Sequence, residues 1–447
     1  MRKIFLSVLT AMIATVSFGQ NQALPTDPNT RIGVLDNGLT YYIRHNELPE
    51  NRAEFYIAQK VGAVLEEESQ RGLAHFLEHM AFNGTANYPG KSMLDYLEKN
   101  GVKFGTNVNA YTGIDETVYM LLDVPTTNPG LVDSCLLVLH DWSSFISLEE
   151  EEIDKERGVI LEELRSRDNA DQRMLQKTLP IMYPNSNYGN RLPGGLPEVV
   201  ANFEYQTLRD YYKKWYRPDL QGIIVVGDID VDKIENRIKE MFADITLAED
   251  ATPRTYFPVE DNIEPIVAIA SDPEASNYSL MVFYKHDAIP YEAKNSLEYF
   301  LLSYITNMVT TMSNYRYQDI TKQAEPPFVY GYSYYGNYYV SPTKDAWTNV
   351  AMPKNADGID EAMSTIIKEN KRIQQYGFTN SEYERAKAEF MKNLDSQYAE
   401  REKQKNGHYV DECLDNFLHG EPMMGIENEY AMYSQLIPNI PLEAINS

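Results

Sequence analysis

The sequence predicts two duplicated domains that each combine helices with strands. The chain has 447 residues, and at about 150 residues per domain this length corresponds to roughly three units or to two large α/β domains. Hydrophobic residues make up 43% of the chain, which is enough apolar material for full-sized cores. The duplication favours two domains, because "LEYFLLSY" from Leu297 repeats the apolar positions of "LAHFLEHM" from Leu73 at an offset of 224 residues. A period of this length indicates duplicated domains and excludes a solenoid.

The N-terminus has the pattern of a cleavable secretory signal over residues 1–19. Arg2 and Lys3 precede an apolar run that ends at Phe18, and small residues adjoin the expected cleavage point after Gly19. No later stretch is long and apolar enough to span a bilayer. We therefore expect export across the inner membrane and a periplasmic or extracellular location.

The charge balance argues against nucleic acid as a partner. The chain has 40 Lys and Arg residues against 66 Asp and Glu residues, a net charge of −26, which repels phosphate backbones and anionic lipid surfaces. A cationic peptide is a better candidate partner, and the alternative is that the acidity only keeps the protein soluble. The two cysteines, Cys135 and Cys413, are predicted to be separately buried thiols and not a disulfide framework.

The residues with the most specific chemistry lie in "GLAHFLEHMAFNG", from Gly72 to Gly84. Its apolar residues recur at helical spacing, and His75 and His79 are four residues apart, so both project from one face of a helix. A lone histidine pair on a helix is more often structural, but Glu78 within the spacing favours a metal site. Two neutral imidazoles and a carboxylate suit Zn²⁺. Glu78 is predicted to be the general base, which takes a proton from the attacking water and passes it to the leaving amine.

The order His-x-x-Glu-His inverts the commoner zinc-protease motif and resembles the M16 family of insulysin, pitrilysin and the mitochondrial processing peptidase. Residues 107–121 resemble the strand pair beside the cleft of that family, and residues 225–230 resemble the end of its first domain. The resemblance implies an α+β, pitrilysin-like fold. In that fold each domain packs helices on one face of a mixed, mostly antiparallel sheet, and duplicated pairs close like a clamshell around the substrate.

The resemblance also implies a third zinc ligand, a glutamate on a later helix. Ser147 and Glu150 form a capping-box pattern for such a helix. Within it, Glu156 and Glu163 are seven residues apart, and their setting resembles the ligand helix of the family. Glu163 is the implied third ligand, and Glu156 would orient a ligand histidine through its second ring nitrogen. The interval from the histidine pair is several residues longer than is usual in the family, which leaves Glu162 as a weaker candidate.

The other features of the sequence indicate no second catalytic site. The tyrosine-rich run from Phe328 to Val340 predicts a hairpin with aromatic cross-strand pairs, with a binding surface as the weaker interpretation. The remaining histidines have no second ligand at metal spacing and are interpreted as structural or surface residues. They are His45, His140, His286, His408 and His419.

The second copy has lost the residues that bind metal in the first copy. The positions of the His-x-x-Glu-His residues and of the two helix acids are occupied in the second copy by Tyr299, Leu302, Ser303, Ala386 and Asn393. The polar, Pro-containing stretch 247–258 is the predicted boundary. It separates a zinc-binding domain at residues 28–250 from a degenerate second domain at residues 255–447.

The second copy is also expected to be truncated at its C-terminus. In the first copy, a helix that opens at Asn202 leads into a strand and another helix, whereas the second copy stops soon after the matching Asn439. A sheet edge would then be left unpaired. We therefore expect the chain to be the N-terminal part of a longer polypeptide or one component of a split protein.

The expected function is that of an exported zinc endopeptidase, which supplies the metal half of a clamshell chamber and cleaves peptides or unfolded segments. The substrate would add as an extended strand beside Asn109 and Ala110. The competing hypothesis is a non-catalytic peptide-binding or assembly subunit of the same fold, against which the intact metal motif argues. A zinc hydrolase that acts on something other than peptides is a third option.

The resemblance further implies that an Arg, followed seven residues later by a Tyr, reaches the site from a partner domain and stabilises the oxyanion. At the matching positions the second domain has Thr321 and Phe328. A threonine hydroxyl is short and neutral, and phenylalanine has no donor. We therefore expect the chain alone to be poorly active, with a C-terminal half or a homologous partner subunit supplying the Arg and Tyr.

Overall fold

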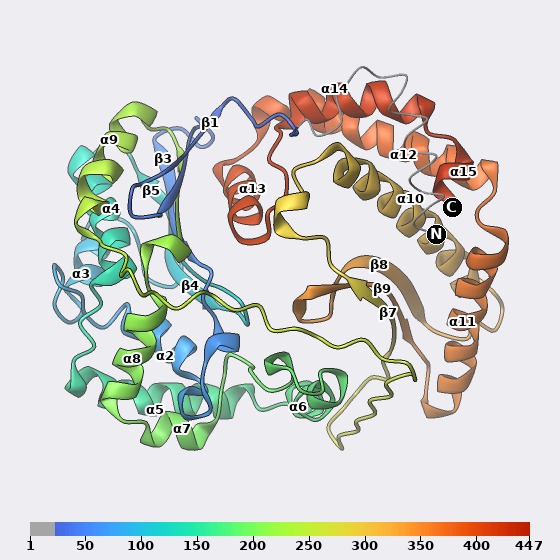
Figure 1. Cartoon of the computed structure of the whole chain (residues 1–447), viewed down its shortest axis with the longest axis horizontal. Coiled ribbons are helices and arrows are strands. Elements are labelled where there is room, and N and C mark those ends of the chain that lie inside the picture. The colour runs from blue at the N-terminus through green and yellow to red at the C-terminus, as the bar shows by residue number, and fades with distance from the viewer. Residues whose placement is uncertain (1–22) are drawn as a thin grey trace. The chain divides into compact units, whose positions relative to one another are not determined.

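The computed structural model describes residues 23–447, and the chain forms two compact units (Figure 1). The first unit contains residues 28–272 and 403–419, and the second contains the rest of the described chain. The sequence divides the chain once, between residues 250 and 255, whereas the structure groups residues 403–419 with the first unit. The predicted signal lies outside the described residues. Among those described, no helix is long and apolar enough to cross a membrane.

The first unit contains a six-stranded sheet in the order β1-β2-β6-β3-β5-β4. Its strands are β1 (Thr30–Val34), β2 (Thr40–His45), β3 (Arg52–Gln59), β4 (Val108–Thr112), β5 (Thr117–Pro125) and β6 (Gln221–Gly227). All neighbouring pairs are antiparallel except β2 and β6, which are parallel. The predicted fold class, with a mixed and mostly antiparallel sheet, is confirmed.

The helices of the first unit lie on both faces of this sheet, whereas the resemblance implied helices on one face only. They are α2 (Leu73–Met80), α3 (Ser92–Lys99), α4 (Pro129–Ser144), α5 (Glu150–Arg167), α6 (Ala170–Met182), α7 (Pro197–Asn202), α8 (Tyr205–Trp215), α9 (Val231–Met241) and α13 (Asn406–His419). On β2, Tyr41 donates a hydrogen bond to Glu235 of α9, and Tyr42 donates one to Asn416 of α13. Successive side chains of a strand point to opposite faces. Therefore α13 covers the face opposite α9, which explains why every residue of β6 is buried.

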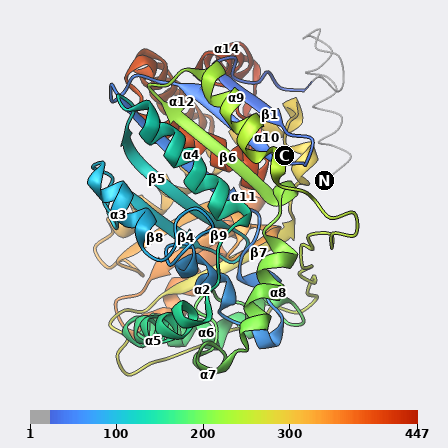
Figure 2. The same cartoon turned by 90° about the vertical axis from the view of Figure 1, so that its left-hand side faces the viewer.

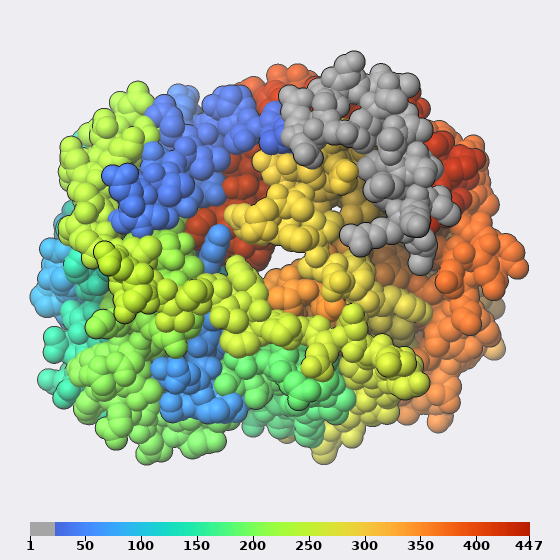
Figure 3. All heavy atoms as spheres, viewed as in Figure 1, coloured from blue at the N-terminus to red at the C-terminus, as the bar shows by residue number. Residues whose placement is uncertain are grey.

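The close packing of α13 depends on a glycine in β6. A Cβ atom at Gly222 would lie 2.9 Å from the ring of Phe417 on α13. Figure 2 shows α4 and α9 running across the other face of the sheet. At the sheet edge, β1 and α9 lie side by side on the surface (Figure 3), where Arg31 donates a hydrogen bond to Asp232 at 3.1 Å.

The start of α5 differs from the sequence prediction. The helix begins at Glu150, its N-cap residue is Glu149, and no side chain makes a capping hydrogen bond. Leu148 has a positive φ of 50°, so the backbone turns sharply before the helix. This turn removes the Ser147 hydroxyl from the N-cap position, and the predicted capping box is wrong. The acids of the first turn instead interact favourably with the helix dipole.

The second unit contains a three-stranded antiparallel sheet in the order β7-β9-β8. Its strands are β7 (Leu280–Asp287), β8 (Tyr330–Tyr338) and β9 (Ser341–Met352), and its helices are α10 (Leu297–Thr321), α11 (Ile359–Tyr376), α12 (Asn380–Ala399), α14 (Ile426–Leu436) and α15 (Leu442–Ile445). The tyrosine-rich run forms one strand, β8, and its hairpin partner β9 lies outside the run. Tyr332 contacts both Tyr330 and Tyr334 along β8. The predicted hairpin is therefore confirmed in part: the run supplies its first strand and its turn, and Tyr335 lies opposite Trp347 of β9.

The second unit has apolar packing at the positions that match the predicted metal site. Ala386, which aligns with Glu156, is fully buried in a cluster with Tyr304 and Met308. Tyr299, which aligns with His75, donates hydrogen bonds to both carboxylate oxygens of Glu421. These residues therefore serve packing and hydrogen bonding, and they do not form a second metal site.

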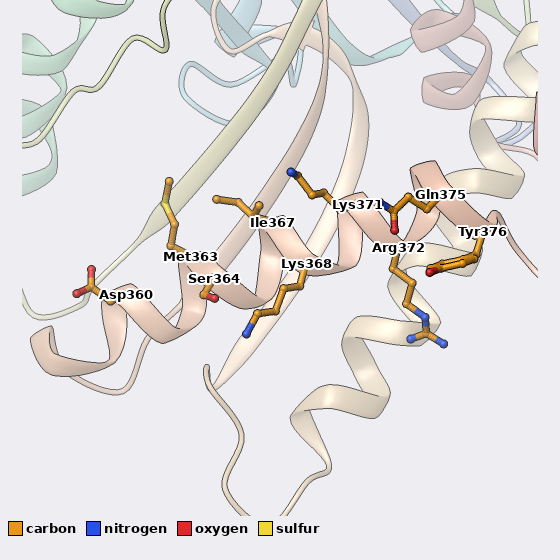
Figure 4. Close-up of a pocket in the computed structure, with 9 residues that line it drawn as sticks. All are labelled: Asp360, Met363, Ser364, Ile367, Lys368, Lys371, Arg372, Gln375 and Tyr376. Carbon is orange, nitrogen blue, oxygen red and sulfur yellow. The ribbon is translucent and has the colours of Figure 1, made fainter.

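A hollow along α11 is lined by residues of that helix alone (Figure 4). Lys368, Lys371 and Arg372 lie along it beside the apolar side chains of Met363 and Tyr376. The lining contains no histidine, cysteine or glutamate. The hollow therefore lacks the donor set that the sequence predicts for zinc.

Glu382 gives the second unit a predicted dependence on acid pH. Burial alone would raise the pKa of Glu382, but hydrogen bonds from Arg316 and Thr379 outweigh it and lower the pKa from 4.5 to about 2. A depressed pKa stabilises the fold above pH 4.5, and this contribution is lost as the pH falls towards 2. Because the side chain is partly solvated, we expect Glu382→Gln to lower the free energy of unfolding at pH 7 by about 1–2 kcal/mol.

Urea denaturation at pH 7 and pH 3 measures this effect. The difference between the wild-type and Glu382→Gln proteins should shrink at pH 3. Glu384→Gln is the matched control, since Glu384 makes an exposed ion pair with Lys387 on the same helix, and such pairs contribute about 0–1 kcal/mol. An equal loss of stability in both variants, or a difference that does not depend on pH, would contradict the prediction.

Candidate metal centre

The helix that carries the motif, α2, is fixed at its N-terminus by a buried glutamate. Gly72 precedes the helix with a φ of 105°, a left-handed conformation that favours glycine. The carboxylate of Glu66 accepts hydrogen bonds from the backbone N–H groups of Gly72 at 3.0 Å and of Ala74 at 2.8 Å. It thereby satisfies donors that a helix terminus leaves free. The role of Glu66 could not be predicted from the motif, because Glu66 lies outside the helix that it caps.

The structure brings His75, His79 and Glu163 together in one cluster of potential metal ligands. The Nε2 atom of His75 lies 3.5 Å from Glu163 Oε1, and the Nε2 atom of His79 lies 3.3 Å from Glu163 Oε2. Two ligands that each lie about 2.0–2.1 Å from one tetrahedral Zn²⁺ are about 3.3–3.4 Å apart. The separations and the donor set, two imidazoles and one carboxylate, therefore fit a catalytic zinc site.

Glu156 fixes the orientation of the His79 ring. The Nδ1 atom of His79 lies 2.7 Å from Glu156 Oε1, and Asn83 donates a hydrogen bond to Glu156 Oε2 at 2.6 Å. A carboxylate can only accept, so Nδ1 carries a proton, and Nε2 is the ring nitrogen that faces Glu163. Metal-bound histidines have this orientation in proteins. The sequence did not lead us to predict this role for Asn83. Its position one helical turn after His79 could have indicated that it lies on the same side as the histidines.

His75 is held in its neutral form. Burial, together with the neighbouring His79, lowers the pKa of His75 to about 4. For His79, burial acts in the same direction, but the hydrogen bond and the charge of Glu156 outweigh it and raise the pKa. A neutral imidazole is the form that binds a metal ion.

Glu78 lies beside the cluster and is not part of it. Thr112, at the end of β4, donates a hydrogen bond to Glu78 Oε2 at 2.5 Å. Burial raises the pKa of Glu78, and the hydrogen bond from Thr112 opposes this shift. A raised pKa makes the carboxylate a better proton acceptor, as general bases require. The sequence did not indicate Thr112, because the strand pairing that brings it to α2 is a tertiary feature.

The structure separates the two candidate acids on α5. Glu162 is exposed, and both of its oxygens accept hydrogen bonds from Arg165. Glu163 faces the two histidines and also forms an ion pair with Arg167 at 2.7 Å. Of the two acids, only Glu163 has a position from which it could bind a metal ion together with the histidines.

The residues predicted to contact substrate lie on the edge strand β4. Asn109 is exposed and Ala110 is half-buried. The side-chain oxygen of Asn109 accepts a hydrogen bond from the backbone N–H of Ala110 at 2.9 Å. This donor of the edge strand is therefore covered by the neighbouring side chain.

The chain belongs to peptidase family M16. The family model for insulinase (peptidase family M16) matches residues 43–194, and the model for the peptidase M16 inactive domain matches residues 202–390. A duplicated α+β fold with this cluster on its first copy agrees with both matches.

Two relatives at the level of sequence are named as zinc proteases. The chain is 32% identical over 409 residues to "Zinc protease PQQL-like" of Arabidopsis thaliana, a match that covers 91% of this chain and 39% of that protein. It is 29% identical over 428 residues to "Probable zinc protease PqqL" of Escherichia coli, which covers 95% of this chain and 45% of that protein. The chain therefore spans less than half the length of these relatives.

Solved structures show the same fold. The first half of the periplasmic protease PqqL from Escherichia coli matches with a TM-score of 0.82 and 27% identity, over 95% of this chain and 89% of that chain. Pitrilysin matches with a TM-score of 0.67 and 18% identity, over 96% of this chain and 45% of that chain. The second likeness shows the fold alone.

Proposed function

We propose that this chain is the metal-binding part of a zinc-dependent endopeptidase that hydrolyses peptides or unfolded polypeptide segments. The observation that carries the proposal is the cluster of His75, His79 and Glu163, with the carboxylate of Glu78 beside it. The three cluster residues would hold Zn²⁺. Relatives named as zinc proteases support the same chemistry.

Each residue of the centre has a role in this proposal. Zinc, when bound, supplies a Lewis acid that polarises the peptide carbonyl and lowers the pKa of the attacking water. Glu78 takes a proton from this water and passes it to the nitrogen of the leaving amine. Thr112 holds the Glu78 carboxylate by its hydrogen bond. Glu156 keeps the Nδ1 proton of His79 in place, so that Nε2 stays available to the metal.

The substrate would add as an extended strand at the edge strand β4. Asn109 would then release the backbone N–H of Ala110, which could pair with the substrate backbone. Backbone pairing imposes little sequence preference, whereas the net charge of −26 favours cationic peptides. We place the protein in the periplasm, since the N-terminus has the pattern of a secretory signal and the Escherichia coli relative is described as periplasmic.

The oxyanion-stabilising Arg and Tyr would come from a C-terminal half or a homologous partner subunit, which would also complete the substrate chamber. The positions that match these two residues serve other purposes in the second unit. Phe328 is fully buried and packs against Tyr317. The hydroxyl of Thr321 donates a hydrogen bond to the backbone oxygen of Gln318. Neither side chain supplies a charged or phenolic donor.

A non-catalytic subunit of the same fold is the second candidate function. It is suggested by the 30% identity over 250 residues to a protein that is named as a subunit of a complex, "Cytochrome b-c1 complex subunit 1, mitochondrial" of Rattus norvegicus, a match that covers 55% of this chain and 49% of that protein. The complete set of His75, His79, Glu163 and Glu78 argues for the peptidase.

A peptide-library digest tests the proposal. The chain is assayed alone and after addition of a homologous M16 half that carries the Arg and Tyr, each with zinc, with chelator, and with zinc restored. We expect weak cleavage by the chain alone and an increase of roughly 10-fold or more with the added half, since an oxyanion donor contributes several kcal/mol. Chelation should abolish cleavage in both arms. Zinc binding without cleavage in either arm would favour the non-catalytic subunit. Full activity of the isolated chain would contradict the hypothesis that a second half or a partner subunit supplies the Arg and Tyr.

A further inference from the structure

A second cluster of metal-ligating side chains lies at one end of the six-stranded sheet. His45 ends β2, Glu47 follows in the turn to β3, and Asp228 follows the last residue of β6. The parallel pairing of β2 with β6 places His45 opposite Gly227, so both strands end at the same edge. One ligand atom from each of the three side chains lies within 4.8 Å of the others. From the sequence, His45 is interpreted as a structural or surface residue, because local spacing does not reveal this strand pairing.

The His45 ring is oriented as a metal ligand. Its Nδ1 atom lies 3.0 Å from the backbone oxygen of Ile229. A carbonyl oxygen can only accept, so Nδ1 donates a proton and Nε2 of the neutral ring carries a lone pair. Nε2 lies 3.3 Å from Glu47 Oε1. Two acceptors at this separation require either a second ring proton or a bound cation between them.

The two carboxylates of the cluster have no lysine or arginine partner among the described residues. Over the described part of the chain, neither Glu47 nor Asp228 forms an ion pair with a lysine or an arginine. Asp228 Oδ2 accepts a hydrogen bond from the backbone N–H of Asn51 at 2.8 Å, which holds the carboxylate in place. Two adjacent carboxylates that repel each other, next to an imidazole lone pair, favour a divalent cation.

We propose that His45, Glu47 and Asp228 bind a divalent transition-metal ion, with Zn²⁺ as the expected ion. One imidazole nitrogen and two carboxylate oxygens suit Zn²⁺, whereas Ca²⁺ and Mg²⁺ are bound by oxygen ligands. Water would complete the coordination. The site is separate from the cluster on α2 and α5, and its existence does not depend on peptidase activity.

The position of the cluster indicates a structural role. The turn from β2 to β3 also holds the start of α13: the Asn46 side chain donates hydrogen bonds to the Gln404 backbone oxygen and to Asn406 Oδ1. The backbone N–H of Asn406 in turn donates to the oxygen of Leu48 at 2.9 Å. An ion that ties Glu47 to the end of β6 would fix this turn. It would therefore strengthen the attachment of α13 to the sheet.

Zinc titration by isothermal calorimetry, after a strong chelator has removed all metal from the full chain, tests the site. We expect two equivalents of Zn²⁺ in the wild-type protein and one in both His45→Ala and Glu47→Gln. Glu47→Gln keeps the size of the side chain and guards against an effect of misfolding. His408→Ala is the matched control: His408 Nε2 also lies 3.3 Å from a glutamate oxygen, of Glu412, but the pair is not part of a three-ligand cluster. This control should retain two equivalents.

Hydrogen exchange in the His79→Ala background separates this site from the proposed catalytic site. Added Zn²⁺ should slow amide exchange in residues 46–51 and 403–406 of His79→Ala, and it should not do so when Glu47→Gln is added to that variant. One equivalent in the wild-type protein that His45→Ala and Glu47→Gln both retain, two equivalents in His45→Ala, or an equal loss in His408→Ala would each overturn the proposal. So would unchanged exchange in both segments.

Discussion

The His79→Ala protein should lose one equivalent of zinc during dialysis against a chelator that leaves the wild-type protein loaded. A catalytic zinc ion has only three protein ligands, and the His79 ring would supply one of them, since it lies 3.3 Å from the carboxylate that would share the ion. Loss of an outer hydrogen-bond partner already weakens metal binding by about 10–100-fold. Loss of a ligand should reduce the affinity for zinc by a larger factor. Metal analysis of the dialysed proteins measures the difference.

The two neighbouring acids on α5 provide a matched pair for this prediction. Glu163→Gln should lose the same equivalent as His79→Ala, because its carboxylate faces both histidines. Glu162→Gln should retain it, since both oxygens of Glu162 bind Arg165 on the exposed side of the helix. The same zinc content in His79→Ala as in the wild-type protein, or the loss of an equivalent in Glu162→Gln, would show that the ligands are assigned incorrectly.

The parts of the site that lie within one helix could be predicted from the sequence. The spacing of His75 and His79 fixes their common face, because helical geometry is local. Glu163 needed the family resemblance, since nothing local relates α5 to α2. Thr112 and Glu66 could not be predicted, because each contacts α2 from outside the helix.

The fold shows the same division between local and tertiary information. The fold class followed from the repeat and the resemblance, and Cys135 and Cys413 are free and buried, as predicted. Helix α13 was assigned to the second domain because chain order is the only guide that a single sequence offers. Its attachment to β6 depends on Gly222 and Phe417, which lie almost two hundred residues apart in the chain. The only local indication that α13 packs closely on β6 was a glycine, Gly222, within an otherwise apolar strand.

The Glu78→Gln protein should keep its zinc and lose most of its activity. Glutamine has the size of glutamate and can still accept the hydrogen bond from Thr112, so the helix and the three metal ligands should be undisturbed. It cannot take a proton from water at neutral pH, and kcat should fall by roughly 10²-fold or more with little change in KM. The assay uses the chain together with the added M16 half, and metal analysis is done on the same samples.

Thr112→Val separates the role of the base, Glu78, from the role of the hydrogen bond that Thr112 donates to it. Valine keeps the shape of threonine and removes the donor, which leaves Glu78 chemically intact but free to rotate. We expect a smaller loss of kcat than in Glu78→Gln and a shifted pH profile, because the hydrogen bond from Thr112 lowers the pKa that burial raises. Without that donor the pKa of Glu78 should rise, and the acidic limb of the profile should move to higher pH. A Glu78→Gln protein that lost its zinc, or that cut peptides at the normal rate, would mean that Glu78 is not the base.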